Sequence, residues 1–154
     1  LIPLSSEIRH ANAYVRLMNQ RFGQSIRFMY HLAPGLSHHL IVKTILQPLV
    51  ENSIKHGFGV DSPGIPISTP AIEVIITAEE DELVININDN GSGFEPSELD
   101  ELLKKSSTAK GGHVGILNVY QRLTAYYGAE KVYISFSSIP YYCNVISIRI
   151  PLGS

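Results

Sequence analysis

The sequence predicts an α+β two-layer sandwich, in which a mixed, mainly antiparallel sheet of about five strands carries three main helices on one face. Segments with apolar residues at helical spacing are interspersed with segments in which apolar and polar residues alternate, the period of a strand. Two pairs of neighbouring strand segments are separated only by short turns, and such hairpins are antiparallel. A sheet of this kind buries one face under its helices.

Length and composition indicate a single domain over residues 1–154. The chain has 154 residues, of which 44% are hydrophobic, enough to bury a sizeable core. Its formal net charge of -2 gives no basic excess, so nothing in the charge indicates nucleic acid or an anionic membrane as a partner. Cys143 is the only cysteine, which excludes an internal disulfide and a zinc site built from thiolates.

The sequence contains no apolar run near the roughly 18 residues of a membrane span and no signal-peptide pattern. It begins with Leu1 instead of Met, so we expect a piece of a longer protein with any membrane anchor or sensor upstream.

Residues 1–23 are predicted to form a leading helix that would connect to that upstream part. An N-cap at Ser5 or Ser6 begins this helix, and Gly23 offers a left-handed stop.

The leading helix has an apolar stripe at helical spacing, formed by Ile8, Ala11, Val15, Met18 and Phe22. Residues 26–31 then alternate with the period of a strand until Pro34-Gly35 breaks the pattern.

Residues 46–58 predict the helix around which the rest of the chain is organised. Its apolar residues would face the core: Leu46, Leu49, Val50 and Ile54. Its polar residues gather on the remaining arc: Glu51, Asn52, Lys55 and His56. Pro48 lacks an N–H and should leave the Thr44 carbonyl unpaired, which predicts a kink or a restart of the helix.

Residues 57–70, rich in Gly, Pro and Ser, predict an exposed loop. The alternating segments 72–76 and 83–89 flank an acidic turn and predict a hairpin whose second strand ends at Asp89.

The last third of the chain predicts two helices and two strands. Pro96 opens a short helix to about Lys104, and the polar segment 104–112 should be mobile. A longer helix runs from about Val114 to Gly128. Two closing strands, at 132–136 and 145–150, surround a turn at Pro140.

Asp89 admits two interpretations. It can be the first residue of a type I or I′ turn in which Asn90-Gly91 reverses the chain. It can also accept a hydrogen bond from an exocyclic amino group, while Gly91 and Gly93 let a base lie against the backbone. Adenine has the required donor and guanine does not. The Gly-Lys-Ser/Thr tripeptide of the common phosphate loop does not occur in the sequence.

The polar arc of the organising helix also admits two interpretations. Glu51 and Lys55 can be an exposed i,i+4 pair on a solvated face. Asn52, however, lies between apolar neighbours and is a poor residue for a helix interior, so its oxygen is a plausible Mg²⁺ ligand, with Glu51 orienting a water. Lys55 and His56 lie about one turn along, where they could face phosphates, although His56 alone could be an ordinary surface residue.

Gly111, Gly112 and Gly115 can form a flexible linker and the start of a helix. Alternatively, the free N–H groups and the dipole of that helix receive a polyphosphate, and Lys110 closes over it as part of a lid.

Taken in this order, VENSIKHG, DNGSGF and GGHVGILNV resemble the asparagine box and the two glycine boxes of the ATP-binding domain shared by histidine kinases, Hsp90, type II topoisomerases and MutL. The segments PLSSEIRHANAYVRLMNQRFG and LQPLVENSIKHG are similar to the LytS/YesM-like branch of bacterial sensor histidine kinases. The resemblance covers nearly the whole chain and implies a Bergerat-type ATP-binding fold.

The resemblance implies a role for each box. Asn52 would be the Mg²⁺ ligand, and Asp89 would read adenine beside Gly91 and Gly93. The phosphate-side lid hinge would be formed by Gly111, Gly112, His113, Val114 and Gly115, with Lys55 and His56 near the phosphates. His113 stands where the branch often has Gly.

The implied reaction is transfer of the ATP γ-phosphoryl to a histidine in an upstream segment, followed by relay to an aspartate of a response regulator. The implied partners are the protein's own upstream dimerisation and phosphoacceptor helices and the regulator, with no nucleic acid. We expect the cytoplasmic domain of a bacterial inner-membrane protein, homodimeric at full length and monomeric as this piece. On its own the piece should not autophosphorylate.

Two other functions stay open on the sequence. An ATP hydrolase of the Hsp90 or MutL type would use Glu51 to activate water. A nucleotide-free interaction module could also keep the same fold.

Overall fold

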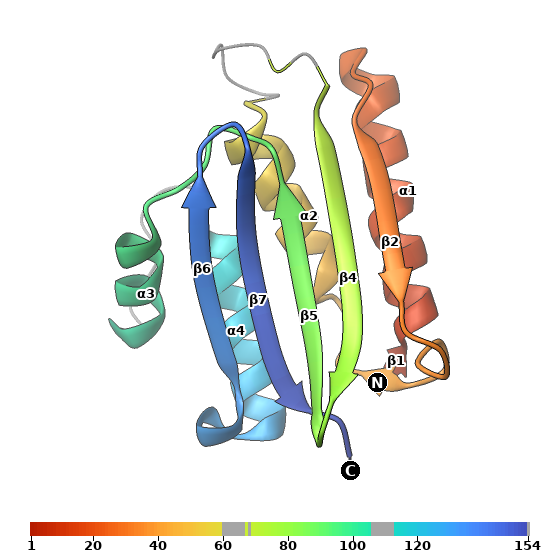
Figure 1. Ribbon diagram of the computed structural model, residues 1–154, viewed down its shortest axis with the longest axis vertical. Helices are drawn as coiled ribbons and strands as arrows, with labels where there is room; N and C mark the ends of the chain where they lie inside the picture. The colour runs from red at the N-terminus through yellow and green to blue at the C-terminus, as the bar shows by residue number, and fades with distance from the viewer. Residues whose placement is uncertain (60–66, 68, 106–112, 154) are drawn as a thin grey trace.

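The structure, a computed structural model, describes residues 1–59, 67, 69–105 and 113–153. Its centre is a five-stranded sheet with the order β2-β4-β5-β7-β6 (Figure 1). The strands span Arg27–Leu32 (β2), Ala71–Glu79 (β4), Glu82–Asp89 (β5), Tyr133–Ile139 (β6) and Cys143–Pro151 (β7). Strand β2 runs parallel to β4 and the other neighbouring pairs are antiparallel, so the predicted mixed, mainly antiparallel sheet is confirmed.

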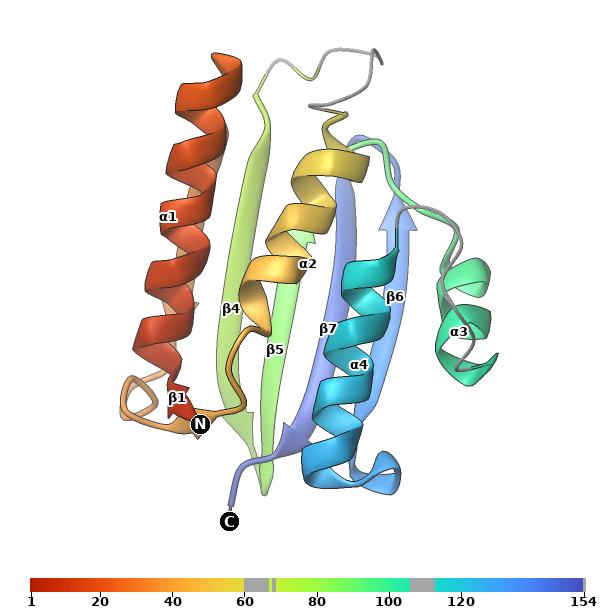
Figure 2. The same cartoon turned by 180° about the vertical axis from the view of Figure 1, so that it is seen from behind.

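Three helices cover one face of this sheet, as predicted: α1 (Leu4–Phe22), α2 (Leu46–Asn52) and α4 (Val114–Tyr127) (Figure 2). The short helix α3 (Pro96–Lys105) lies beside β6 at one edge of the sheet (Figures 1 and 2). Two short strands, β1 (Ile2–Pro3) and β3 (Leu40–Ile41), pair with each other and were not predicted. A strand of two residues is too short to show an alternating pattern in the sequence. A single 3₁₀ turn, η2 (Ala129–Lys131), follows α4.

The predicted apolar stripes form the core between the helices and the sheet. The predicted inward residues of α1, α2, the following turn, β4 and β5 are exposed by 6% or less, apart from Phe22, which is partly buried at the edge of the core. They are Ile8, Ala11, Val15, Met18, Leu46, Leu49, Val50, Ile54, Ile72, Val74, Ile76, Leu83, Ile85 and Ile87. Burial of this apolar surface, at about 25 cal/mol per Å², is the main force that holds helices and sheet together.

Helix α1 begins earlier than predicted, because its N-cap is Pro3 and not Ser5 or Ser6. No side chain caps this end. The first N–H groups of the helix instead donate to carbonyls in the loop 37–39, which replaces the expected hydroxyl cap. The predicted left-handed end at Gly23 is confirmed by its φ of 63°.

The kink or restart of the helix predicted at Pro48 is wrong, because α2 runs without a break from Leu46 to Asn52. Because α2 begins at Leu46, Pro48 lies in the first turn, where an N–H has no intrahelical partner in any case. The Thr44 carbonyl, predicted to be unpaired, accepts a hydrogen bond from Nη1 of Arg122 at 3.0 Å. Thr44 itself precedes the helix and has a φ of 64°, an uncommon conformation for a β-branched residue.

The two predicted loops lie largely outside the described residues. Residues 60–66 and 68 belong to the first loop, and residues 106–112 belong to the second. The mobility predicted for segment 104–112 therefore stays a prediction, except that Lys104 and Lys105 form the end of α3.

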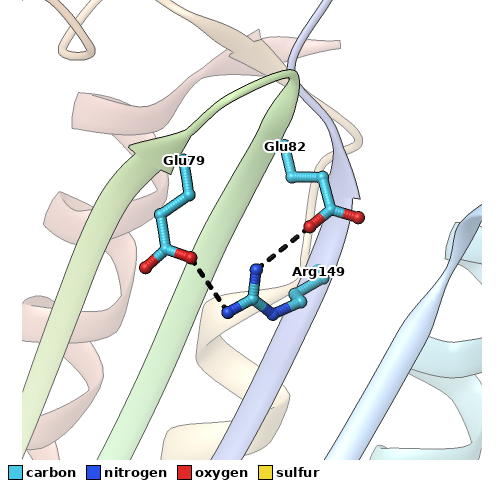
Figure 3. Close-up of polar contacts among 3 residues, drawn as sticks. All are labelled: Glu79, Glu82 and Arg149. Atoms are coloured by element: carbon cyan, nitrogen blue, oxygen red, sulfur yellow. Dashed lines mark hydrogen bonds and ion pairs between the residues drawn. The ribbon is translucent and has the colours of Figure 1, made fainter.

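Arg149 connects the turn of the β4–β5 hairpin to β7 on the face of the sheet opposite the helices (Figure 3). Its Nη1 lies 3.0 Å from Glu82 and its Nη2 lies 3.0 Å from Glu79. The hydrogen bonds to Glu82 and Glu79 raise the pKa of Arg149. Since all three side chains reach water, the network helps to align the strands and contributes little to stability.

Candidate nucleotide site

A cavity of about 540 Å³ opens between α2 and α4. This volume falls within the usual range for small-molecule sites. The cavity is lined by Thr44, Pro48, Glu51, Asn52, Lys55, His56, Val114, Gly115, Asn118, Val119 and Arg122. The structure therefore brings the whole predicted polar arc to one cavity and places the start of α4 on the opposite wall.

The helix that carries the polar arc changes geometry within the site. Helix α2 ends at Asn52 and continues as a π-helical turn, η1 (Ser53–Gly57). The Phe58 N–H donates to the Ser53 carbonyl at 2.9 Å, which closes the wider turn. Such π turns are frequent at functional sites. This one carries Lys55 on the wall of the cavity.

Asp89 ends β5 and accepts hydrogen bonds on both carboxylate oxygens. Its Oδ2 accepts from the Ser53 hydroxyl at 2.7 Å. Its Oδ1 accepts from the Gly91 N–H at 2.8 Å and from the Asn144 amide at 3.0 Å. The carboxylate therefore points toward the helix layer and is held by three different segments of the chain.

Gly91 and Gly93 have packing reasons to be glycine. A Cβ on Gly91 would lie 2.6 Å from the backbone of Gly57. Gly93 has a φ of 88°, and its Cβ would lie 2.6 Å from the Ser138 hydroxyl. Neither Asn90 nor Gly91 adopts a positive φ, so the type I′ turn considered for this stretch is not formed.

Asn52 and Asp89, the two residues predicted to bind opposite ends of a nucleotide, line a common cavity of about 10 Å³. Its other lining residues are Ser53, His56, Gly57, Gly93, Phe94 and His113. Asn52 and His56 also line the larger cavity, so the two spaces adjoin. The predicted adenine side and phosphate side therefore meet at the C-terminal end of α2.

His113 covers the Asn52 side chain where the two cavities meet. Its Nδ1 lies 3.2 Å from the Asn52 Oδ1, and its ring centroid lies 5.2 Å from that of His56. Burial lowers the pKa of His113, and the neighbouring His56 lowers it further. A neutral imidazole protonated on Nδ1 can donate to the amide oxygen.

The remaining lid residues of the prediction are only partly described. Lys110, Gly111 and Gly112 lie outside the described residues. Val114 and Gly115 line the larger cavity, and a Cβ on Gly115 would lie 3.4 Å from the Pro48 carbonyl, so α4 begins close to α2.

Sequence reasoning missed three polar residues that line these cavities, Ser53, Asn118 and Arg122, and a fourth, Asn144, that donates a hydrogen bond to Asp89. Asn118 and Arg122 lie four residues apart, a spacing that places them on one side of α4. Asn144 and the buried Ile146 lie two residues apart and therefore face the same side of β7. A polar residue at an inward position of a strand is unusual, and the sequence alone could have identified Asn144 on that basis.

Residues 38–154 match the family described as histidine kinase-, DNA gyrase B-, and HSP90-like ATPase. The chain belongs to this ATPase family. As a member of it, the protein is an ATP-binding domain, as the resemblance of its three boxes implied. No helix among the described residues of this ATPase domain is long and apolar enough to cross a membrane.

The ATPase domain is similar in sequence to bacterial sensor proteins. It is 34% identical over 134 residues to the sensor protein LytS of Oceanobacillus iheyensis, which covers 85% of this chain and 22% of that protein. It is 29% identical over 153 residues to LytS of Bacillus subtilis, which covers 99% of this chain and 25% of that protein. The chain thus spans about a quarter of the length of these relatives, and the resemblance to the LytS branch is confirmed.

Solved structures of histidine kinases share the fold of this ATPase domain. The nucleotide-free catalytic domain of histidine kinase ThkA superposes with a TM-score of 0.68 at 14% identity, covering 97% of this chain and 93% of that one. Acinetobacter baumannii histidine kinase AdeS gives a TM-score of 0.65 at 15% identity, covering 100% of this chain and 67% of that one. The predicted fold class is therefore confirmed.

Proposed function

We propose that this chain is the catalytic domain of a bacterial sensor histidine kinase, which binds Mg-ATP and donates the γ-phosphoryl to a histidine elsewhere in the protein, for relay to a response regulator. The observation that carries this proposal is the convergence of Asn52 and Asp89 on adjoining cavities in a chain similar to LytS proteins. The whole protein would be a membrane-associated homodimer with this domain in the cytoplasm.

At the adenine end, Asp89 would accept a hydrogen bond from the exocyclic amino group. The Ser53 hydroxyl uses one acceptor position of Oδ2, and a carboxylate oxygen offers about two. Gly57 and Phe94 line the adjoining small cavity. A purine would enter by widening this space, since a volume of about 10 Å³ is too small for a base.

At the metal end, the available oxygens suit Mg²⁺. The ion prefers oxygen ligands and usually keeps several waters, with one or two protein oxygens and the phosphates of a substrate. Asn52 supplies an amide oxygen at the cavity, and Glu51 supplies a carboxylate that accepts a hydrogen bond from Gln47 at 3.1 Å. Within the described residues, no three His, Cys, Asp or Glu side chains gather into a metal site, so a Mg²⁺ ion bound here would take its other ligands from water and from the phosphates of ATP.

When bound, Mg²⁺ would neutralise charge on the β- and γ-phosphates. The side-chain oxygen of Asn52 would bind the ion. The hydrogen bond between this oxygen and the His113 Nδ1 would have to break first. Glu51 would orient a water beside the phosphates.

At the phosphate end, positive charge and free N–H groups lie together. Lys55 and His56 line the larger cavity, opposite Val114 and Gly115 at the start of α4. The first N–H groups of α4 lack intrahelical partners and carry the positive end of the helix dipole. We propose that these groups bind the polyphosphate, with Lys110, Gly111 and Gly112 closing the lid.

The chemical step would be an in-line displacement at the γ-phosphorus. A ring nitrogen of the acceptor histidine forms the new N–P bond, and the bond from phosphorus to the oxygen of ADP breaks. Catalysis of such a step consists mainly of positioning and of charge stabilisation. Lys55 would stabilise the charge that develops on the leaving phosphate oxygens.

The test is calorimetry of ATP binding to the domain, with and without Mg²⁺, for the wild type and for Asn52→Ala. We expect Mg²⁺ to tighten ATP binding in the wild type and to have little effect in Asn52→Ala. Asn86→Ala, on the outer face of β5, is the matched control and should behave as the wild type. A Mg²⁺ effect that survives Asn52→Ala would reject Asn52 as the ligand.

Kinase activity requires the full-length protein. We expect γ-phosphoryl label on a histidine of the full-length protein, in an acid-labile linkage, and none on the isolated domain. ATP turnover by the isolated domain that is lost in Glu51→Gln would instead indicate a hydrolase.

A further inference from the structure

Three polar side chains form a row across the end of the sheet, beside the small cavity. Asp89 of β5 is paired with Asn144 of β7, and Asn144 is paired with Ser138 of β6. Asn144 is 1% exposed and shares the inward phase of Ile146 and Ile148. A buried amide therefore occupies a position that the strand period reserves for an apolar side chain, and it must be hydrogen-bonded.

The hydrogen bonds of the row fix which way the Asn144 amide faces. The Phe94 N–H donates to the Ser138 hydroxyl at 3.2 Å, and that hydroxyl donates to the Asn144 Oδ1 at 2.6 Å. The amino group of Asn144 must then face the other way. It donates to the Asp89 Oδ1 and to the Gly91 carbonyl, each at 3.0 Å.

This arrangement leaves the two oxygens of Asp89 unequal. Oδ1 accepts from both Gly91 and Asn144, which uses its acceptor capacity. Oδ2 accepts only from Ser53 among the described residues and keeps a free acceptor position. The carboxylate is thus locked in one rotation, with a single acceptor position available to a ligand.

We propose that Asn144 is a positioning residue that makes this site selective for purines with a 6-amino group. The inference rests on the proposed function, in which Asp89 reads the base. By holding Oδ1, Asn144 prevents the carboxylate from turning, so Oδ2 meets an amino donor in a fixed direction. A purine with a 6-oxo group brings an acceptor against that oxygen and is rejected.

A different result is expected if Asn144 only stabilises the fold and does not position Asp89. The amide also ties the loop after β5 to the β6–β7 hairpin, where the Tyr141 N–H donates to the Gly91 carbonyl at 2.7 Å. Loss of that tie alone would lower stability and weaken every nucleotide equally. Selectivity between 6-amino and 6-oxo purines is therefore the informative measurement.

The test compares Mg-ATP with Mg-ITP, which has an oxygen in place of the 6-amino group, by calorimetry on the domain. In Asn144→Ala we expect ATP affinity to fall about tenfold while ITP affinity changes by less than about twofold, so the preference falls about tenfold. If the alanine variant does not fold, Asn144→Val replaces it, because valine favours strands and suits an inward position. We expect the same loss of preference in Asn144→Val.

Ser138→Ala is the matched control. It removes the bond to the Asn144 Oδ1, but the Asp89 Oδ1 and the Gly91 carbonyl are both acceptors and still require the amino group on their side, so the preference should stay within about threefold of the wild type. If the wild type prefers ATP and both Asn144 variants keep that preference, the inference fails and the proposed function stands. If the wild type binds ATP and ITP equally, Asp89 does not read the base, and the proposed adenine site fails with the inference.

Discussion

Asp89 carries the adenine hypothesis as a single residue, because its carboxylate is the group aimed from the sheet into the helix layer. We predict that Asp89→Asn weakens ATP binding by about 1–3 kcal/mol, since the amide can turn a donor toward the base and leave a buried polar group unpaired. Calorimetry measures this loss. Asp100→Asn, on the exposed side of α3, is the control. Unchanged affinity, or equal binding of ATP and GTP, would reject Asp89 as the reader.

Glu7 is a residue that sequence reasoning did not single out. It lies on α1 with no exposed surface, its Oε1 accepts from the Ile45 N–H at 2.7 Å, and its Oε2 has no hydrogen-bond partner within the described residues. Burial raises the pKa of Glu7, although the hydrogen bond from Ile45 opposes this.

The raised pKa of Glu7 predicts a pH dependence of stability. The folded state binds the proton of the Glu7 carboxyl more tightly than the unfolded state does. The stability that this proton contributes is therefore complete below the ordinary pKa of Glu and is lost as the pH rises through the pKa of Glu7 in the folded state. Glu7→Gln keeps an acceptor for Ile45 and removes the titration. We expect urea unfolding to show that Glu7→Gln gains stability relative to the wild type as the pH rises above the ordinary pKa of Glu.

The exposed Glu101→Gln on α3 serves as the control for this pH profile. Parallel profiles of the wild type and Glu7→Gln would contradict the prediction, because they would mean that Glu7 ionises as freely when folded as when unfolded.

Among the elements, the contact between η1 and the loop after β5 decides whether the site can form. The Ser92 N–H donates to the Gly57 carbonyl at 2.7 Å, and the two backbones leave no room for a Cβ at Gly91. We predict that Gly91→Ala lowers the free energy of unfolding by about 1–3 kcal/mol, because the added carbon forces the backbones apart. Thermal or urea unfolding measures the change.

Gly153→Ala is the matched control for this contact, since its Cβ would meet no heavy atom within 4 Å. Equal stability of the two variants would show that the loop moves aside without cost.

The types of the elements were predictable because helical and strand periods are local properties. The β4–β5 hairpin, α3 from Pro96 and α4 up to Gly128 form where the pattern predicts them. Details set by neighbours were not predictable. Pro48 is harmless because α2 starts only two residues before it, and the π turn after Asn52 has no signature in the residue pattern.

For the molecule as a whole, α1 is part of the fold although the family match begins only at residue 38. The helix buries five apolar residues and packs on α2: Leu4, Ile8, Ala11, Val15 and Met18. We predict that a fragment of residues 24–154 loses cooperative unfolding, because a strip of the core would face water. Calorimetric melting tests this, with removal of residues 153–154 as the control. A wild-type melting transition in the shorter fragment would show that α1 is separable.

The sequence by itself determined the classes of the elements, the inward faces of the helices and strands, and the three boxes that place the chain in its ATPase family. Each of these depends on residues close together in the chain. Only the tertiary structure decided that β2 runs parallel to β4, that His113 lies on Asn52, and that Asn144 stands opposite Asp89. Those contacts join residues that lie dozens of positions apart in the sequence. They depend on the order of the strands and on the packing of the elements, and no local period in the sequence encodes either.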